Sequence, residues 1–302
     1  MQTHASGLSL DAVSLWVGLL SLLLGAVVGS FCNVVILRLP KMLLENSETA
    51  PTHSPQPFDL STPPSHCPQC SKRLQPSHLI PILSYWWLKG KCAFCGQVIP
   101  SRYWKTELLV SLWWLFCAFK FQLLNPTLSL EPLGTLFVTQ GLSALLWALM
   151  GSALMCLTQI DWEYQLLPDA ITQPLLWLGL LGANFGLLNL TPQEALWGAA
   201  VGYTSFWVIA NGYRILCARD GMGQGDMKLL AALGAWMGPL SLIPLVLLAS
   251  TCGAIVGIWR LKVKKDLSLN EPIAFGPFLI FAALALLVLG PKVVLHFLGL
   301  GA

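Results

Sequence analysis

Two carboxylates at the ends of apolar segments are the side chains in this sequence best placed for chemistry. Asp161 closes one segment in Ile160-Asp-Trp-Glu163, and Asp226 precedes another in Gly221-Met-Gly-Gln-Gly-Asp226. Two carboxylates at one depth of a membrane edge can share a proton, because like charges that close cannot both ionise. One then acts as general base on a water and the other as general acid on a carbonyl. The pair could therefore hydrolyse a peptide bond.

Each carboxylate near these segments also has a structural explanation. Asp161 could be a charge at a helix end, and Asp226 could pair with Lys228 or cap the following helix. We expect Asp169 to be a helix N-cap and Glu163 to be a solvated interfacial carboxylate, with substrate binding as its alternative role. Glycines beside Asp226 are expected to adopt positive φ and to let the backbone approach a substrate closely: Gly221, Gly223 and Gly225.

Four cysteines form a second candidate site. They occur as two C-x2-C turns separated by 21 residues: Cys67, Cys70, Cys92 and Cys95. Two such turns can supply the four thiolates of a tetrahedral Zn²⁺ site, which is structural because no coordination position stays open. Disulfides or redox-active thiols are the alternative, and a reducing cytoplasm argues against structural disulfides. The other five cysteines lie in apolar segments, where packing roles are expected.

The composition indicates that a membrane positions these sites. Of the 302 residues, 55% are apolar and 10% are charged, whereas a soluble domain is roughly 25% charged. A net charge of +3 gives no reason to expect a nucleic-acid partner. The first apolar run has neither a basic segment before it nor a cleavage site after it, so we expect no cleavable signal peptide. Apolar segments occur at 13–37, 106–124, 134–160, 170–188, 193–217, 229–259 and 276–299.

The distribution of basic residues predicts the topology. Fifteen of the 17 Lys and Arg fall in three groups, at 38–105, 214–228 and 260–265, which the positive-inside rule assigns to the cytoplasm. The segment 229–259 must then cross an even number of times, as a hairpin broken at Gly238-Pro239. We predict an all-α polytopic membrane protein of about eight transmembrane helices, with both termini outside.

Three regions follow from this topology. Residues 1–37 form the first transmembrane helix, and residues 38–105 form a small cytoplasmic zinc domain held by the four cysteines. That domain begins with a Pro/Ser/Thr-rich linker near 46–65, which is expected to be extended or disordered. Residues 106–302 form the transmembrane core that carries both aspartates.

Several motifs, in one order along the chain, resemble those of the type IV prepilin peptidases. The first is similar to the family's GSFLNVVIxRLP, and the one after the cysteines is similar to its ISxRYPxVE. In this sequence the motifs are Gly29–Pro40, the cysteine quartet, Ile99–Glu107, Ile160–Asp169, Pro174–Leu180, Gly221–Leu230 and Pro272–Pro277. The resemblance covers most of the chain.

The resemblance implies a bifunctional enzyme of the bacterial inner membrane. Members are GxGD-type aspartic proteases, whose two aspartates correspond to Asp226 and Asp161. They cut the basic leader of type IV prepilins or type II secretion pseudopilins after a glycine, at the cytoplasmic face. They then methylate the new N-terminal residue with S-adenosylmethionine. A Gly-Lys pair that the family associates with methyl transfer corresponds to Gly90 and Lys91.

Two other functions stay open at this point. One is a peptidase without methyl transfer, because the chain has no G-x-G-x-x-G of a Rossmann-type cofactor site. The other is a proton-coupled transporter, since membrane carboxylates can relay protons. The aspartates stand at segment ends, however, and no internal repeat is visible, whereas many transporters are built from repeats.

Overall fold

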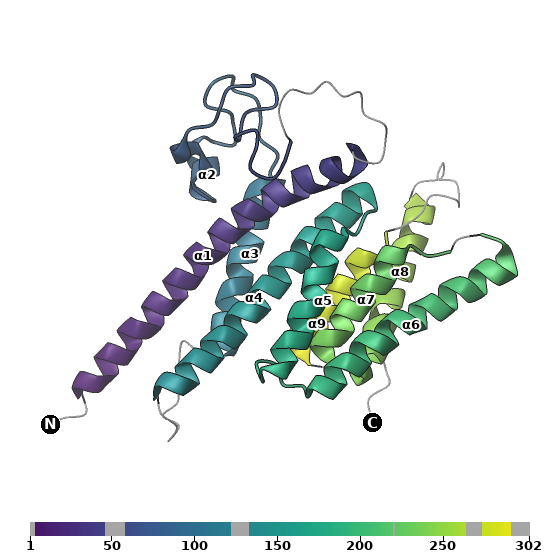
Figure 1. Ribbon diagram of the computed structural model, residues 1–302. Coiled ribbons are helices and arrows are strands. Elements are labelled where there is room, and N and C mark those ends of the chain that lie inside the picture. The colour runs from purple at the N-terminus through teal and green to yellow at the C-terminus, as the bar shows by residue number, and fades with distance from the viewer. Residues whose placement is uncertain (1–3, 46–57, 122–132, 220, 264–273, 291–302) are drawn as a thin grey trace. The chain divides into compact units, whose positions relative to one another are not determined.

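The regular secondary structure of the described residues is helical, and those residues contain two isolated β-bridges but no β-strand. The structure is a computed structural model and describes residues 4–45, 58–121, 133–219, 221–263 and 274–290 (Figure 1). The chain divides into two compact units, Met1–Cys156 and Leu157–Ala302. The long helix α4 (Leu133–Tyr164) passes from one unit into the other.

In the first unit, α1 (His4–Glu45) packs along α3 (Arg102–Lys120). Two glycines four residues apart on α1 allow this close approach: a Cβ at Gly25 would lie 2.7 Å from the Cα of Ser111, and one at Gly29 would lie 2.7 Å from the Cα of Glu107. Such small-xxx-small pairs let helix backbones meet in membranes. Ser111 also donates a hydrogen bond to the carbonyl of Leu22, 2.5 Å away.

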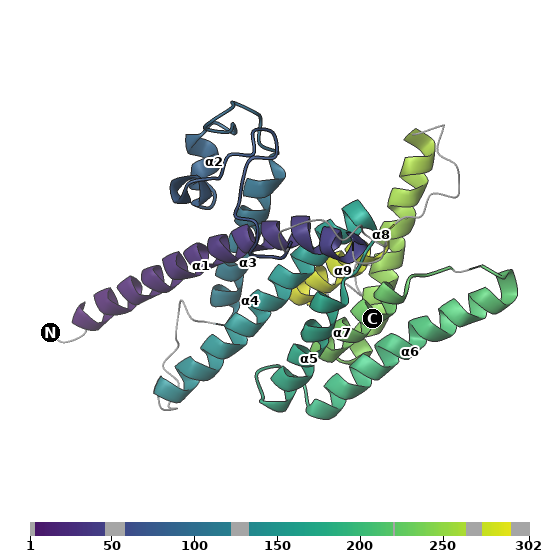
Figure 2. The same cartoon turned by 45° about the horizontal axis from the view of Figure 1, so that its top comes forward.

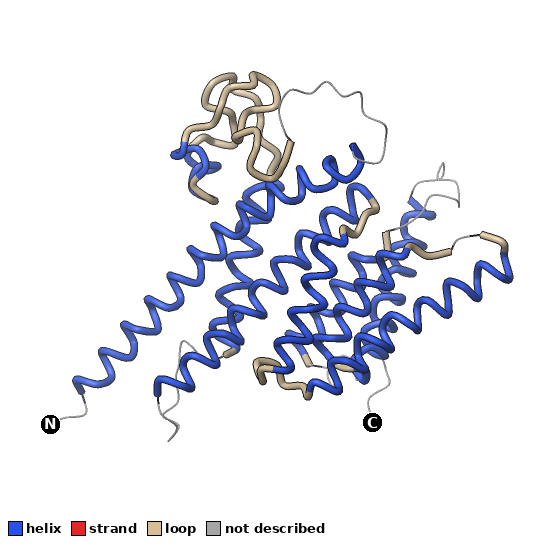
Figure 3. Tube along the Cα trace, viewed as in Figure 1, coloured by secondary structure: helices blue, strands red, loops and turns tan. Residues whose placement is uncertain are grey.

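Loops and short helices form the cysteine-containing region between α1 and α3. They include the 3-10 turn η1 (Pro76–Leu79) and the helix α2 (Leu83–Trp87), and Figure 3 shows how little of this region is helical. Arg38 joins α1 to the end of the predicted linker by donating to the carbonyls of Asp59 (3.0 Å) and Pro63 (2.6 Å). Most of that linker, residues 46–57, lies outside the described residues.

In the second unit, α7 (Gln224–Met237) is packed on several sides. Its neighbours are α5 (Asp169–Asn184), α6 (Pro192–Cys217) and α9 (Gly276–Leu289), as Figures 1 and 2 both show. Every residue from Leu229 to Trp236 is buried. Glycines again allow two helices to pack closely, because a Cβ at Gly198 of α6 would overlap the carbonyl oxygen of Gly234 of α7. A helix that is apolar all round belongs inside a core.

The predicted break in segment 229–259 is present. Helix α7 ends at Met237, Gly238 takes a φ of +76°, and the 3-10 turn η2 (Pro239–Ser241) leads into α8 (Leu242–Val263). Three segments are long and apolar enough to cross a membrane by length and composition: Leu15–Leu44, Val138–Tyr164 and Pro239–Arg260. The helical class and the membrane-spanning character are therefore confirmed, while the number of eight spans remains a prediction.

Candidate active site and metal site

Asp161 lies in the last turn of α4, and its environment is set by how that helix ends. Gln165 adopts a left-handed φ of +52° and donates its N–H to the carbonyl of Asp161, 2.9 Å away. This turn stops the helix just beyond the carboxylate. The residue is only 4% exposed, and among the described residues its Oδ2 has no hydrogen-bond partner. A buried carboxylate oxygen without a partner is costly, so it suits a site that takes up a proton or a water.

Asp226 lies in the first turn of α7, where a negative charge is favoured by the helix dipole. Gly223 is the N-cap residue, and the Asp226 side chain makes no capping hydrogen bond. The alternative that Asp226 caps this helix is therefore not observed. Its other alternative partner, Lys228, instead donates to both carboxylate oxygens of Asp169, at 2.8 and 2.7 Å.

Three segments that are distant in the sequence meet around the two aspartates. A Cβ at Gly276, the first residue of α9, would lie 2.5 Å from Oδ2 of Asp161 and 3.3 Å from Cδ1 of Leu167. A Cβ at Gly225, beside Asp226, would lie 2.8 Å from the Cβ of Leu167. Leu167 therefore lies against Gly276, which faces Asp161, and against Gly225, which precedes Asp226. Gly276 belongs to one of the family motifs, but the sequence alone predicted no role for it in the site.

The two aspartates also interact through their charges. Asp226 lies outside the three candidate spans. Burial, together with the negative charge of Asp161, raises the pKa of Asp226 to about 7. A raised carboxyl pKa favours the protonated form near neutral pH, which is the state needed in a pair that shares one proton.

Two predictions about this region are wrong. Asp169 is not a helix N-cap: Pro168 occupies that position with extended backbone, and Asp169 is the first residue of α5, where it pairs with Lys228. The positive φ expected of these glycines is not found at Gly223, which has a φ of −70°, or at Gly225, which lies within α7. Gly225 serves close packing against Leu167, and Gly221 packs against the ring of Tyr213. Helix propensity does not predict the Asp169–Lys228 pair or the packing of these glycines, because these are tertiary contacts.

The four predicted cysteines meet at one point. Their sulfur atoms all lie within 4.8 Å of one another, and Sγ of Cys67 is 3.8 Å from Sγ of Cys95. A tetrahedral Zn²⁺ with Zn–S bonds of about 2.3 Å separates its sulfurs by about 3.8 Å. The geometry therefore fits a closed structural zinc site, and the four residues would hold the ion without an open position.

The two C-x2-C turns have the same backbone construction, which explains why the sulfurs converge. The amides of Ser71 and Gly96 donate to the carbonyls of Cys67 and Cys92, at 2.9 and 3.0 Å. Both Ser71 (φ +56°) and Gly96 (φ +71°) are left-handed, so each chain turns back after its second cysteine. Backbone N–H groups of Cys70 and Gln69 lower the pKa of the Cys67 thiol to about 6, which favours the thiolate that binds metal.

Gly90 and Lys91 lie between α2 and the second C-x2-C turn. Gly90 is buried with a φ of +67°, and a Cβ there would lie 3.0 Å from the hydroxyl of Tyr85. Lys91 is exposed and pairs with Val98 in a short antiparallel bridge. The positive φ and the close Tyr85 hydroxyl both favour glycine at this position. The assignment of Gly90 and Lys91 to cofactor binding stays a prediction.

Comparison with known proteins connects both sites to one family. The family model described as bacterial peptidase A24 N-terminal domain matches residues 23–121, and that of the type IV leader peptidase family matches residues 148–258. Relatives named prepilin leader peptidase/N-methyltransferase include one from Pseudomonas aeruginosa (38% identical; 91% of each chain) and one from Dickeya chrysanthemi (41%; 85% of this chain and 87% of the relative). No solved structure gives a significant match. The chain belongs to the type IV leader peptidase family.

Proposed function

We propose that the protein cleaves the leader of type IV prepilins or pseudopilins with the Asp161–Asp226 pair and then methylates the new N-terminus. The observation that carries the peptidase half is the pair itself, in which the buried carboxylate of Asp161 at the end of α4 interacts with the partly exposed carboxylate of Asp226 at the start of α7. Family membership and the names of the relatives support both halves, and they favour a peptidase over a transporter.

The proposed cleavage needs one protonated and one ionised carboxyl group. The ionised group takes a proton from a water, whose oxygen attacks the scissile carbonyl carbon, while the protonated group donates to the carbonyl oxygen. Collapse of the tetrahedral intermediate breaks the C–N bond, and the amine leaves with a proton from the pair. Gly276 leaves room for the Asp161 carboxylate, and Leu167 keeps water away from one side of the pair.

For methyl transfer we propose S-adenosylmethionine as the methyl donor. When bound, this donor would supply a sulfonium-activated methyl group to the amine that leader removal exposes, and it would be released as a neutral thioether once the amine has lost a proton. The four-cysteine site would hold a structural Zn²⁺ that stabilises the loops between α1 and α3. A small, loop-rich region of this kind needs a metal ion or another cross-link to fold.

We place the enzyme in the bacterial inner membrane as a multi-pass protein of about eight spans, with its active site at the cytoplasmic face. The basic residues support this orientation. A prepilin with an apolar helix and a basic leader would then present its cleavage point at the depth of the two aspartates. Two residues that bear on this topology, Lys264 and Lys265, lie outside the described residues.

The test is an assay of purified protein in detergent with a synthetic prepilin, with and without S-adenosylmethionine. Mass spectrometry separates leader loss from a further methyl increment. Asp161→Asn and Asp226→Asn should each abolish cleavage in a folded protein. Glu194→Gln is the matched control, because Glu194 only completes the capping box of α6 with Thr191, and glutamine keeps that role. Near-normal cleavage by either aspartate variant would refute the pair.

A further inference from the structure

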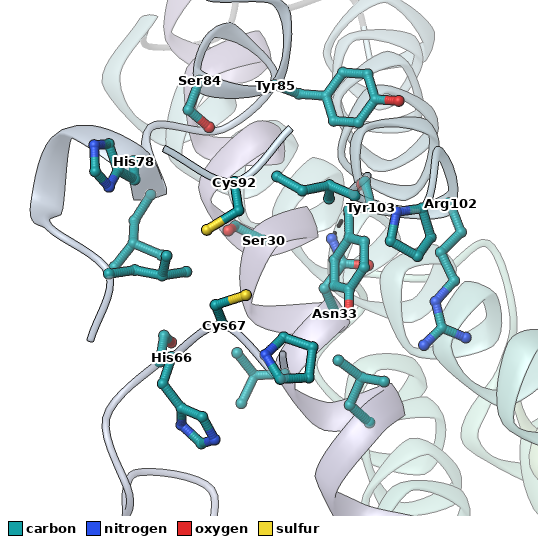
Figure 4. A pocket seen from close by; sticks show the side chains of 18 of the residues that line it. Ser30, Asn33, His66, Cys67, His78, Ser84, Tyr85, Cys92, Arg102 and Tyr103 are labelled. Carbon is teal, nitrogen blue, oxygen red and sulfur yellow. Dashed lines mark hydrogen bonds between the residues drawn. The ribbon is translucent and has the colours of Figure 1, made fainter. Parts of the chain in front are cut away.

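A cavity of about 640 Å³ lies beside the cysteine site in the first unit. Its volume falls in the range of small-molecule sites, about 300–1,000 Å³. It is formed by α1, the first turns of α3 and the loops that carry the cysteines, and Cys67 and Cys92 line one wall. Figure 4 shows these two side chains close together at that wall, and their sulfur atoms lie within 4.8 Å of each other. Neither Asp161 nor Asp226 lines the cavity, so the proposed peptidase site does not account for it.

Two family motifs that the dyad does not use converge on this cavity. From Gly29–Pro40 come Ser30, Asn33, Val34, Leu37 and Arg38, and from Ile99–Glu107 come six further lining residues that include Tyr103 and Glu107. The motifs are joined directly, because Asn33 donates from Nδ2 to the carbonyl of Tyr103 at 3.1 Å. Gly29 lets α1 approach α3 at the level of Glu107.

Glu107 places a buried carboxyl group at the cavity. It is 9% exposed, and its Oε2 accepts a hydrogen bond from the backbone N–H of Ile82 at 2.6 Å. Side-chain hydrogen bonds from Ser30 and Asn33 also reach it. Within the described residues no lysine or arginine forms an ion pair with it. Burial favours the neutral form of a carboxyl group unless a cation lies beside it, so a positively charged ligand would hold Glu107 in its ionised form.

Aromatic side chains provide the remaining recognition surface. Tyr85, Tyr103, Trp104 and Phe58 all line the cavity, and the rings of Tyr85 and Trp104 lie 6.1 Å apart. Aromatic faces bind planar heterocycles by stacking and attract cations. Lys41 lines the same cavity and offers a cation to a ligand carboxylate. A ligand with a positive centre, a planar base and a carboxylate matches this set.

We propose that this cavity binds S-adenosylmethionine, with the Glu107 carboxylate as the counter-charge to its sulfonium and the aromatic residues as the surface for its adenine. The inference rests on the proposed methyltransferase activity and gives that activity its binding site. Two of the four cysteines form part of the cavity wall, so loss of the cysteine site should also disturb donor binding.

Equilibrium binding of radiolabelled S-adenosylmethionine to the purified full-length protein tests the proposal. Glu107→Gln removes the charge and keeps the size, and it should weaken binding at least tenfold. S-adenosylhomocysteine has a neutral sulfur, so the wild type should prefer S-adenosylmethionine, and this preference should shrink in Glu107→Gln. An unchanged preference would overturn the role of Glu107.

A second pair of variants tests the cavity without touching the charge. Ala93 lines the cavity, and Ala93→Trp should fill it and abolish binding. Gln69 occupies the third position of the first C-x2-C turn and does not line the cavity, so Gln69→Trp should bind like wild type. Zinc content and melting temperature report folding in each variant.

The outcomes separate the inference from the proposed function. If the wild type binds the donor and folded Ala93→Trp binds it equally well, the cavity is not the site, and the methyltransferase activity stands. If the wild type neither binds the donor nor adds a methyl group to cleaved prepilin, the proposed methyltransferase function itself fails.

Discussion

Replacing Gly276 by alanine should impair peptide cleavage by moving one catalytic carboxylate. The added Cβ would lie 2.5 Å from Oδ2 of Asp161, whereas ordinary contacts begin near 3.4 Å. Either the carboxylate or the start of α9 must therefore shift by about 0.9 Å. A misplacement of about 1 Å can cost on the order of 100-fold in rate, which is about 2.7 kcal/mol of barrier.

The assay for this variant is the rate of leader removal from a synthetic prepilin under single-turnover conditions, followed by mass spectrometry. Gly253→Ala on α8 is the matched control, because its Cβ would lie 3.6 Å from the Phe278 ring in ordinary contact. We expect the control to cleave at the wild-type rate. A folded Gly276→Ala protein that cleaves within threefold of wild type would show that Gly276 does not set the position of Asp161.

Three further predictions concern packing, metal and pH. Gly198→Ala should lower the free energy of unfolding in detergent by about 1–3 kcal/mol, because its Cβ would overlap the carbonyl of Gly234. Gly212→Ala on the same helix meets open space and should be neutral or up to about 1 kcal/mol stabilising. Equal melting temperatures of the two variants would contradict this prediction. The double variant Cys67→Ser/Cys70→Ser should lose about one zinc ion per chain, as measured by metal analysis. Cys217 is exposed, and Cys217→Ser should keep its zinc. Wild-type protein without zinc would exclude the metal site. Cleavage needs one protonated carboxyl, so kcat/KM should fall as pH rises through the pKa of Asp226, which burial and Asp161 raise to about 7; a rate that stays flat to pH 9 would argue against a shared proton.

The sites that the sequence predicts well are those built by local chain geometry. Each C-x2-C turn positions its own two sulfurs, and the repeated turn, with a left-handed residue after the second cysteine, makes two equivalent halves. Spacing alone therefore predicts the ligand set. The break at Gly238-Pro239 is local in the same way, because proline cannot continue the hydrogen bonding of a helix.

Contacts between distant segments could not be predicted in this way. Asp169 pairs with Lys228, 59 residues away, and a helix-capping rule has no access to that partner. Gly276 lies against Asp161 although 114 other residues separate them in the sequence. The first helix also continues to Glu45 through Pro40, beyond the predicted end of the span at residue 37. Glycine pairs four residues apart, at 25/29 and 198/202, lie at these close helix contacts and are the sequence pattern that favours them.

The residues proposed for the two activities do not overlap, and this has a functional consequence. Asp161, Asp226, Leu167 and Gly276 all belong to the unit that starts at Leu157, whereas every residue lining the cavity belongs to the unit that ends at Cys156. The two sets share no helix, because α4 supplies Asp161 but no cavity residue. Charge removal at Glu107 and at Asp161 should therefore affect different steps. Cleavage must come first, because the amine that accepts the methyl group does not exist until the leader is removed.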